Sequence, residues 1–105
     1  MMPEAFACPY LNARVELTGE REDHVRVRHP DLLPEHRGCI AETLKEPERV
    51  RPSARVNNAL MFTRWFPNVR GGRFVVVVVV SDAGAQPRHW IVTAYMTRRL
   101  AEKDV

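Results

Sequence analysis

The sequence predicts an α+β fold in which two N-terminal helices pack on one face of a three- to four-stranded antiparallel sheet. Before Pro52, apolar side chains recur at helical spacing between prolines, as in short amphipathic helices. After Pro52, short apolar runs alternate with turn residues, and the run Val75–Val80 is β-branched throughout. Helices that cover one face of a sheet leave the other face open, so we expect functional residues on that open face.

The first helix is expected over residues 19–29. Thr18 is a suitable N-cap, and acidic residues follow it in the first turn, where the helix dipole favours negative charge. Pro30 ends the helix, because the residue before a proline avoids the helical conformation. Ahead of this helix, residues 1–12 are predicted to be an irregular lead-in and Arg14–Thr18 a short strand or extended entry.

The second helix is expected to begin at Pro34, since proline is favoured in the first turn of a helix. Ile40 and Leu44 then share one helical face, and Pro47 ends the helix. His36 lies near the same face and is expected to be a packing residue.

Three strands are expected after the helices, over residues 59–66, 73–81 and 88–97, and Arg49–Arg51 is a further candidate strand. Side chains alternate along a strand, so one set in the last strand should face the helices and the other set the open face. The set expected against the helices is Trp90, Val92, Ala94 and Met96. The set expected on the open face is His89, Ile91, Thr93 and Tyr95.

The chain is expected to form a single domain over residues 1–105, with residues 98–105 as a basic C-terminal tail. Residues 1–50 hold seven Lys/Arg and ten Asp/Glu, a net charge of −3, whereas residues 51–105 hold nine and three, a net charge of +6. Fourteen of the 16 cations are arginine, which suits bidentate binding of phosphate, although a GC-rich genome also explains this content. The charge asymmetry is typical of nucleic-acid-binding proteins.

Composition argues against several classes of protein. The longest apolar run, Phe74–Val80, is far shorter than the roughly 20 residues that span a bilayer. The N-terminus has no basic segment leading into an apolar stretch, so we expect no signal peptide and a cytoplasmic location. Cys8 and Cys39 form no CxxC pair, and the four histidines have no metal-ligand spacing. We therefore expect free thiols, no metal and no other cofactor.

Several short segments resemble the phage-type branch of the barnase, EndoU, colicin and RelE nucleases, known as the BECR fold. The segments that carry the resemblance are His24–Pro30, Pro52–Arg55, Phe62–Phe66, Gly72–Phe74 and Trp90–Tyr95. Members of this group typically cut RNA without a metal, by acid/base catalysis that drives the ribose 2′-OH onto the adjacent phosphate. The resemblance implies a metal-independent endoribonuclease, with RNA as the partner. It also permits a toxin module that an acidic antitoxin or immunity protein covers, and a homodimer interface would help so small a chain.

Such a reaction needs a base, an acid for the 5′-oxygen and a cation over the phosphate, roles that His, Tyr and Arg fill near neutral pH. His24 in the first helix is the expected base or acid, and Arg28 shares its helical face as a phosphate ligand. Arg64, in an otherwise apolar strand, is expected to stabilise the phosphate. Thr93 and Tyr95 are expected to supply the second proton-handling or orienting group.

Four further residues are expected to bind substrate. Ser53 and Arg55 follow a proline in a loop, where they position substrate or form a turn. His29 equally fits a cap at the C-terminus of the first helix. His89 lies at the start of the last strand, on the rim of the open face. The candidates also have structural interpretations: a half-buried histidine, an edge-strand charge or simple β-propensity.

Two other functions fit the same sequence. A non-catalytic RNA- or DNA-binding domain would show the same basic half, with Trp65, Phe66 and Tyr95 as stacking platforms. A protein-interaction domain would bind its partner through the open sheet face or an exposed strand edge. Convergence of the four predicted catalytic residues in one basic cleft would favour the nuclease, and scatter would favour the two alternatives.

Overall fold

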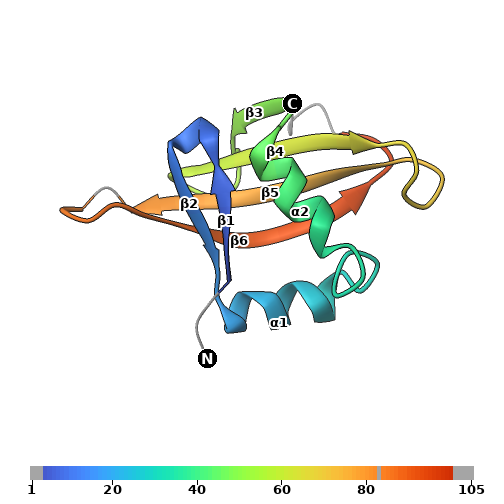
Figure 1. Cartoon of the computed structure of the whole chain (residues 1–105), viewed down its shortest axis with the longest axis horizontal. Helices are drawn as coiled ribbons and strands as arrows, with labels where there is room; N and C mark the ends of the chain where they lie inside the picture. The colour runs from blue at the N-terminus through green and yellow to red at the C-terminus, as the bar shows by residue number, and fades with distance from the viewer. Residues whose placement is uncertain (1–3, 83, 101–105) are drawn as a thin grey trace.

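The computed structural model describes residues 4–82 and 84–100, which form six strands, two α-helices and one short 3₁₀ helix. In chain order these elements are β1 (Glu4–Cys8), η1 (Pro9–Leu11), β2 (Ala13–Leu17), α1 (Gly19–Arg28), α2 (Arg37–Lys45), β3 (Arg49–Pro52), β4 (Ala59–Phe66), β5 (Arg73–Asp82) and β6 (Arg88–Thr97). All six strands belong to one sheet in the order β1-β2-β6-β5-β4-β3 (Figure 1). Its neighbouring strands are antiparallel except β2 and β6, which are parallel.

The fold class predicted from the sequence is therefore wrong, because the sheet has six strands instead of three or four and is mixed instead of antiparallel. Two of its strands precede the helices. β1 occupies residues that were expected to be an irregular lead-in, and it forms a hairpin with β2. The hairpin joins the sheet through a single parallel pair, Glu16 with Trp90. Local sequence gives no sign of this pairing, since its two strands come from opposite ends of the chain.

Helix α1 forms where the sequence predicts it and lies along the edge of β6 (Figure 1). The hydroxyl oxygen of Thr18 accepts the backbone N–H of Arg21 at 3.2 Å, which confirms the predicted N-cap. The guanidinium of Arg21 donates to the carbonyl of Val92 in β6 at 3.3 Å. This contact ties the helix to the sheet edge at a point that β2 does not pair with.

Helix α2 begins at Arg37 and not at Pro34 as predicted. Residues 30–36 consist largely of turns, and the Leu33–Pro34 peptide bond within them is cis. Ile40 and Leu44 are fully buried, as their shared helical face predicts. The helix ends at Lys45, two residues ahead of the proline that was expected to stop it.

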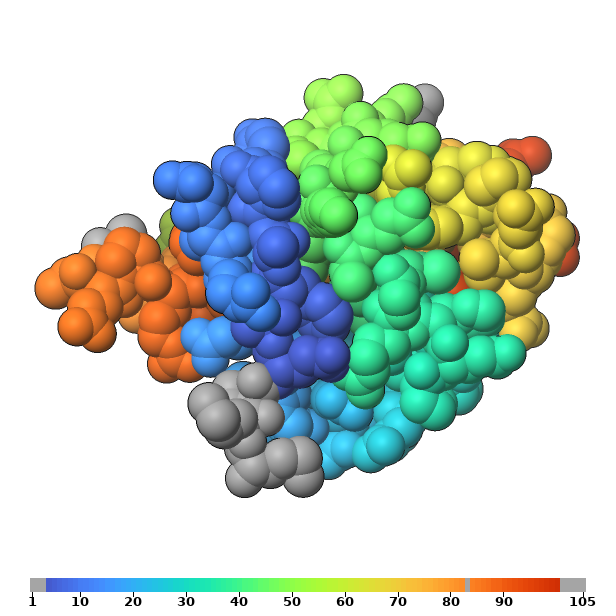
Figure 2. Space-filling view, viewed as in Figure 1, coloured from blue at the N-terminus to red at the C-terminus, as the bar shows by residue number. Residues whose placement is uncertain are grey.

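Helix α2 and the β1–β2 hairpin cover one side of the sheet, which we call the α2 face (Figures 1 and 2). Most of the buried apolar side chains lie here, and a fully buried Val, Leu, Ile or Phe contributes about 1.5–3 kcal/mol relative to an exposed position. The central strands β4, β5 and β6 contribute Phe62, Phe66, Val75, Val77, Val79, Ile91 and Ala94. This face therefore holds the main hydrophobic core.

The opposite side of the sheet, the second face, has a smaller apolar cluster and rows of aligned side chains. Its buried apolar residues are Ala59, Met61, Val76 and Val78. The strand register aligns Arg51, Met61, Val78 and Thr93 in one row and Arg49, Thr63, Val76 and Tyr95 in the next. Each row thus begins with an arginine on the edge strand β3 and ends with a hydroxyl group on β6.

A β-bulge in β6 changes which side chains face α2. Val78 and Val79 follow one another in β5, but their partners in β6 are Thr93 and Ile91, which leaves Val92 as an extra residue. In β6, the residues before Val92 therefore face the side of the sheet opposite to the one predicted from strict alternation. The residues after Val92 face the predicted side. His89 and Ile91 align with the α2 face, and Trp90, Thr93 and Tyr95 align with the second face.

The expected C-terminal tail is only partly within the described residues. Residues 98–100 follow β6 without forming a helix or strand, and the hydroxyl of Thr97 donates to the carbonyl of Arg99 at 2.7 Å. Residues 101–105 lie outside the described range, as do residues 1–3 and residue 83.

Candidate functional site

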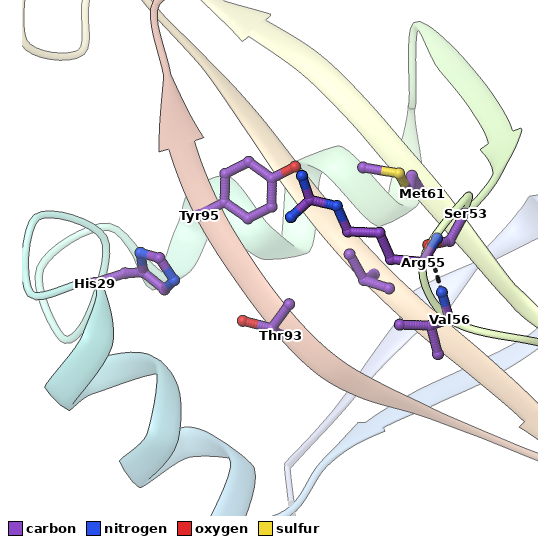
Figure 3. A pocket seen from close by; sticks show the side chains of 8 residues that line it. His29, Ser53, Arg55, Val56, Met61, Thr93 and Tyr95 are labelled. Atoms are coloured by element: carbon purple, nitrogen blue, oxygen red, sulfur yellow. Dashed lines mark hydrogen bonds between the residues drawn. The ribbon is translucent and has the colours of Figure 1, made fainter. Parts of the chain in front are cut away.

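A hollow of about 440 Å³ opens on the second face, bounded by the C-terminal end of α1, strand β6 and the β3–β4 loop (Figure 3). We call it the site hollow. Its lining residues are His29, Ser53, Arg55, Val56, Met61, Val78, Thr93 and Tyr95. All five polar members of this set are site residues predicted from the sequence. The three apolar members were not predicted, because nothing in the local pattern distinguishes them from ordinary core residues.

The end of helix α1 fixes the position of His29. The backbone N–H of His29 donates to the carbonyl of Val25 at 2.7 Å, and its own carbonyl accepts the N–H groups of Leu32 and Leu33 at 3.0 and 3.3 Å. Both leucines are fully buried, so the backbone of His29 is held on both sides. Its ring centroid lies 5.8 Å from that of Tyr95. His29 is thus the predicted C-cap and also a wall of the site hollow.

The surroundings of His29 favour the neutral imidazole. Partial burial lowers the pKa of His29, because it removes water from the charged form. The carboxylate of Asp31 raises this pKa, while the charges of His24 and Arg28 lower it further, and the net shift is downward. A histidine with a lowered pKa is neutral at pH 7 and can accept a proton there.

Strand β6 contributes Thr93 and Tyr95. The two residues are separated by one position beyond the bulge, so their side chains project from the same face of the sheet. Tyr95 is half-buried and packs against the apolar cluster of the second face, which limits the positions its ring can take. The phenol and the threonine hydroxyl therefore lie on a fixed strand opposite the imidazole of His29 (Figure 3).

The β3–β4 loop brings Arg55 to the site hollow. The loop is closed by a hydrogen bond from the N–H of Ser53 to the carbonyl of Ala59 at 2.9 Å. The hydroxyl oxygen of Ser53 accepts the N–H groups of Arg55 and Val56, each at 3.2 Å. With the loop folded in this way, the Arg55 side chain extends across the hollow toward the phenol of Tyr95 (Figure 3). Ser53 therefore has the turn-forming role that its sequence context allows and also lines the site.

The positive charge of Arg55 is not neutralised within the described part of the chain, where no carboxylate lies within 4.0 Å of it. Arg37, Arg64 and Arg88, by contrast, each form an ion pair with a glutamate. A guanidinium beside hydroxyl groups and without an acidic partner is suited to binding phosphate.

Two predicted site residues on α1 lie outside the hollow. His24 and Arg28 line a shallow depression on the outer side of the helix, together with Asp23 and Val27. They share one helical face, as their spacing predicts, but this face does not include the lining of the site hollow. His24 affects the site through its charge, which lowers the pKa of His29.

Arg64 lies on the α2 face, on the other side of the sheet from Tyr95. Its guanidinium donates to the backbone carbonyl of Glu46 at 2.8 Å and lies 3.7 Å from the carboxylate of Glu42. Glu46 is the C-cap of α2, so Arg64 satisfies a carbonyl at the negative end of that helix. The structure gives Arg64 a role in packing and places it away from the hollow.

His89 is also outside the hollow. Its Nδ1 lies 2.7 Å from the hydroxyl oxygen of Ser81, near the β5–β6 turn. Of the predicted stacking residues, Tyr95 lines the hollow, Phe66 is buried on the α2 face and Trp65 is 37% exposed on the second face. Only one of these three aromatic rings therefore belongs to the site.

No family model, curated protein or solved structure matches this chain. Among residues 4–82 and 84–100, no group of three His, Cys, Asp or Glu side chains lies together in a way that could hold a metal ion. Cys8 and Cys39 are buried thiols, and burial raises the pKa of both. No helix within the described residues is long and apolar enough to cross a membrane. The site hollow is therefore the basis for a functional assignment.

Proposed function

We propose that this protein is a metal-independent endoribonuclease whose active site is the site hollow. The observation that carries the proposal is that an imidazole, a phenol and an arginine line one hollow on the second face, and that this arginine has no acidic partner among residues 4–82 and 84–100. Attack of a ribose 2′-OH on the adjacent phosphate needs a base, an acid and a cation near neutral pH, and these three groups can fill those roles. The four residues predicted to be catalytic do not all converge, because His24 and Arg64 lie outside the site hollow. The proposal therefore keeps Thr93 and Tyr95 and assigns the other two roles to His29 and Arg55, which line the hollow with them.

His29 acts as the general base in this proposal. Its lowered pKa keeps the imidazole neutral at pH 7, and the fixed backbone of the helix end holds the ring toward the hollow. The neutral ring accepts the proton of the 2′-OH, and the 2′-oxygen then forms a bond to the adjacent phosphorus. This proton transfer is the step that an uncatalysed ribose hydroxyl performs poorly at neutral pH.

Tyr95 and Arg55 act on the phosphate side of the reaction. The bond from phosphorus to the 5′-oxygen breaks as the phenol of Tyr95 donates a proton to that oxygen. Arg55 stabilises the negative charge that develops on the phosphate oxygens, and Thr93 orients the same group through its hydroxyl. The products are a 2′,3′-cyclic phosphate and a 5′-OH, and return of a proton from His29 to Tyr95 restores both groups.

The first test replaces His29 by Gln and, as a matched control, His24 by Gln. Loss of a proton-transfer group typically costs about 100- to 10,000-fold in rate, so we expect a loss of this size for His29→Gln. His24→Gln should stay within a few-fold of wild type, because its side chain lies on the outer surface of α1. The measurement is cleavage of a fluorescently labelled RNA, with thermal unfolding of both variants to verify that they fold.

The same assay tests the chemistry. Cleavage should continue in EDTA, yield a 2′,3′-cyclic phosphate and fail when a 2′-deoxy residue is placed at the cleaved linkage. Loss of cleavage in EDTA would refute the metal-independent mechanism. A larger loss for His24→Gln than for His29→Gln would return the base role to His24, and RNA binding without any cleavage would favour the non-catalytic alternative.

A further inference from the structure

A second hollow adjoins the site hollow and shares two of its residues, Ser53 and Val56. It has a volume of about 650 Å³ and lies at the end of strands β3, β4 and β5. The residues found only in this second hollow are Pro52, Asn57, Asn58, Ala59, Leu60, Ser81 and Asp82. The β3–β4 loop therefore separates two neighbouring binding spaces and lines both of them.

The two hollows have opposite electrostatic character. The site hollow contains Arg55 and His29, whereas the described residues that line the second hollow include no cationic side chain and one carboxylate, that of Asp82. Amide and hydroxyl groups of Asn57, Asn58 and Ser81 complete its polar lining beside apolar walls. A phosphate is repelled by such a lining, while a neutral, flat group with N–H donors fits it.

The carboxylate of Asp82 is available to such donors. Its Oδ1 accepts the backbone N–H of Gly84 at 3.1 Å, and no other hydrogen bond to this carboxylate is formed by the described residues. The nearby guanidinium of Arg88 forms two hydrogen bonds with the carboxylate of Glu16, at 3.0 and 3.1 Å. Arg88 therefore directs its donors to β2, and Asp82 can accept further hydrogen bonds from a ligand.

We propose that the second hollow binds the base of a nucleotide next to the scissile phosphate and prefers a base with an exocyclic amino group. This inference rests on the proposed ribonuclease function. In this arrangement the phosphate binds beside Arg55, the nucleic-acid strand passes over Ser53 and Val56, and the neighbouring base enters the second hollow. There the amino group of the base donates to Asp82, and the amide of Asn57 forms a hydrogen bond with another polar atom on the edge of the base. Adenine, cytosine and guanine carry the amino group, whereas uracil has none.

This arrangement also selects the form of the nucleic acid. A base whose Watson–Crick edge contacts Asp82 and Asn57 cannot be paired at the same time, so the substrate is single-stranded at this position. Asp82 is exposed, and a hydrogen bond exposed to water discriminates less than a buried one. We therefore expect a preference at the lower end of the range for base contacts, about five- to tenfold.

The test uses short oligonucleotides that contain a single ribonucleotide, so that only one linkage can be cleaved. The base on either side of this linkage is varied among the four bases and an abasic residue. Wild type should cleave the amino-bearing bases about five- to tenfold faster than uracil or the abasic residue at one of the two positions. Asp82→Asn and Asn57→Ala should each reduce this ratio. The control variant Glu46→Gln also replaces a carboxylate by a carboxamide, but at the end of α2, and should leave the ratio unchanged.

The outcomes separate this inference from the proposed function. Absence of cleavage for every oligonucleotide would refute the ribonuclease proposal, and the base preference is then measured as binding of an all-deoxy strand by fluorescence anisotropy. Cleavage that is equal for all bases at both positions would overturn the inference and leave the function standing. A base preference that persists in both Asp82→Asn and Asn57→Ala would also overturn it, because recognition would then lie elsewhere.

Discussion

The two faces of the sheet differ in how they use apolar surface and charge. On the α2 face, helix α2 and the β1–β2 hairpin form the outer surface (Figure 2), and a large cluster of aliphatic and aromatic side chains is buried beneath them. On the second face, a small cluster forms the floor of the site hollow and remains partly open. Arg64 on the α2 face has a carbonyl and a carboxylate as partners, whereas Arg55 on the second face lacks a carboxylate among the described residues. One face therefore holds most of the buried apolar surface, and the other carries an arginine without an acidic partner among the described residues.

Removal of a side chain from the α2 face should have the largest effect on stability. Ile91 is fully buried there, and Ile91→Ala should lower the free energy of unfolding by about 2–5 kcal/mol. Thr93 follows Ile91 by two residues and is half-buried on the second face. Thr93→Ala should therefore lower the free energy of unfolding by less than about 1 kcal/mol. Urea denaturation of both variants measures the difference. Equal losses would contradict the division of β6 by its bulge.

Two arginine variants should show opposite defects. Arg55→Ala should reduce the kcat/KM of RNA cleavage by about 100- to 1,000-fold with little change in stability, as for other groups that stabilise transition-state charge. Arg64→Ala should leave cleavage nearly unchanged but lower the free energy of unfolding by about 1 kcal/mol, because it removes the cap on the C-terminus of α2. Steady-state kinetics and denaturation of the two proteins test this pair. A strong catalytic defect in Arg64→Ala alone would reverse the functions of the two faces.

The smallest expected effect is a pH dependence of stability that comes from His29. Its pKa is lower in the folded protein, so the unfolded chain binds this proton more readily. The free energy of unfolding should therefore decrease as the pH falls through the ordinary histidine pKa of about 6.5 and level off below the folded-state pKa.

Substitution by Gln isolates this contribution. Denaturation of wild type and His29→Gln between pH 5 and 8 should show that the variant lacks this part of the slope, since the other titrating groups are common to both. Identical slopes would mean that the site hollow does not favour the neutral imidazole.

Much of the local structure was predictable from sequence. The bounds of β4 and β6 agree with the predicted strands, and α1 begins after its predicted N-cap Thr18. These features depend on residues close together in the chain: β-branched runs, prolines and a capping hydroxyl. The five polar residues that line the site hollow were all among the predicted site residues, but His24 and Arg64 were predicted together with them and lie elsewhere.

Local patterns in the chain predicted α1 and the strands β4, β5 and β6, but not strand β1 or the start of α2. They also identified candidate His, Arg, Tyr and hydroxyl groups, and packing between distant segments brings only some of these groups together. Helix α1 lies along the edge of β6, which brings the ring of His29 to Tyr95 and leaves His24 on the outer surface. The extra residue at Val92 sets which β6 side chains face α2, and the β1–β2 hairpin completes a mixed sheet. These outcomes depend on register and packing between distant segments, and patterns within a few residues do not contain that information.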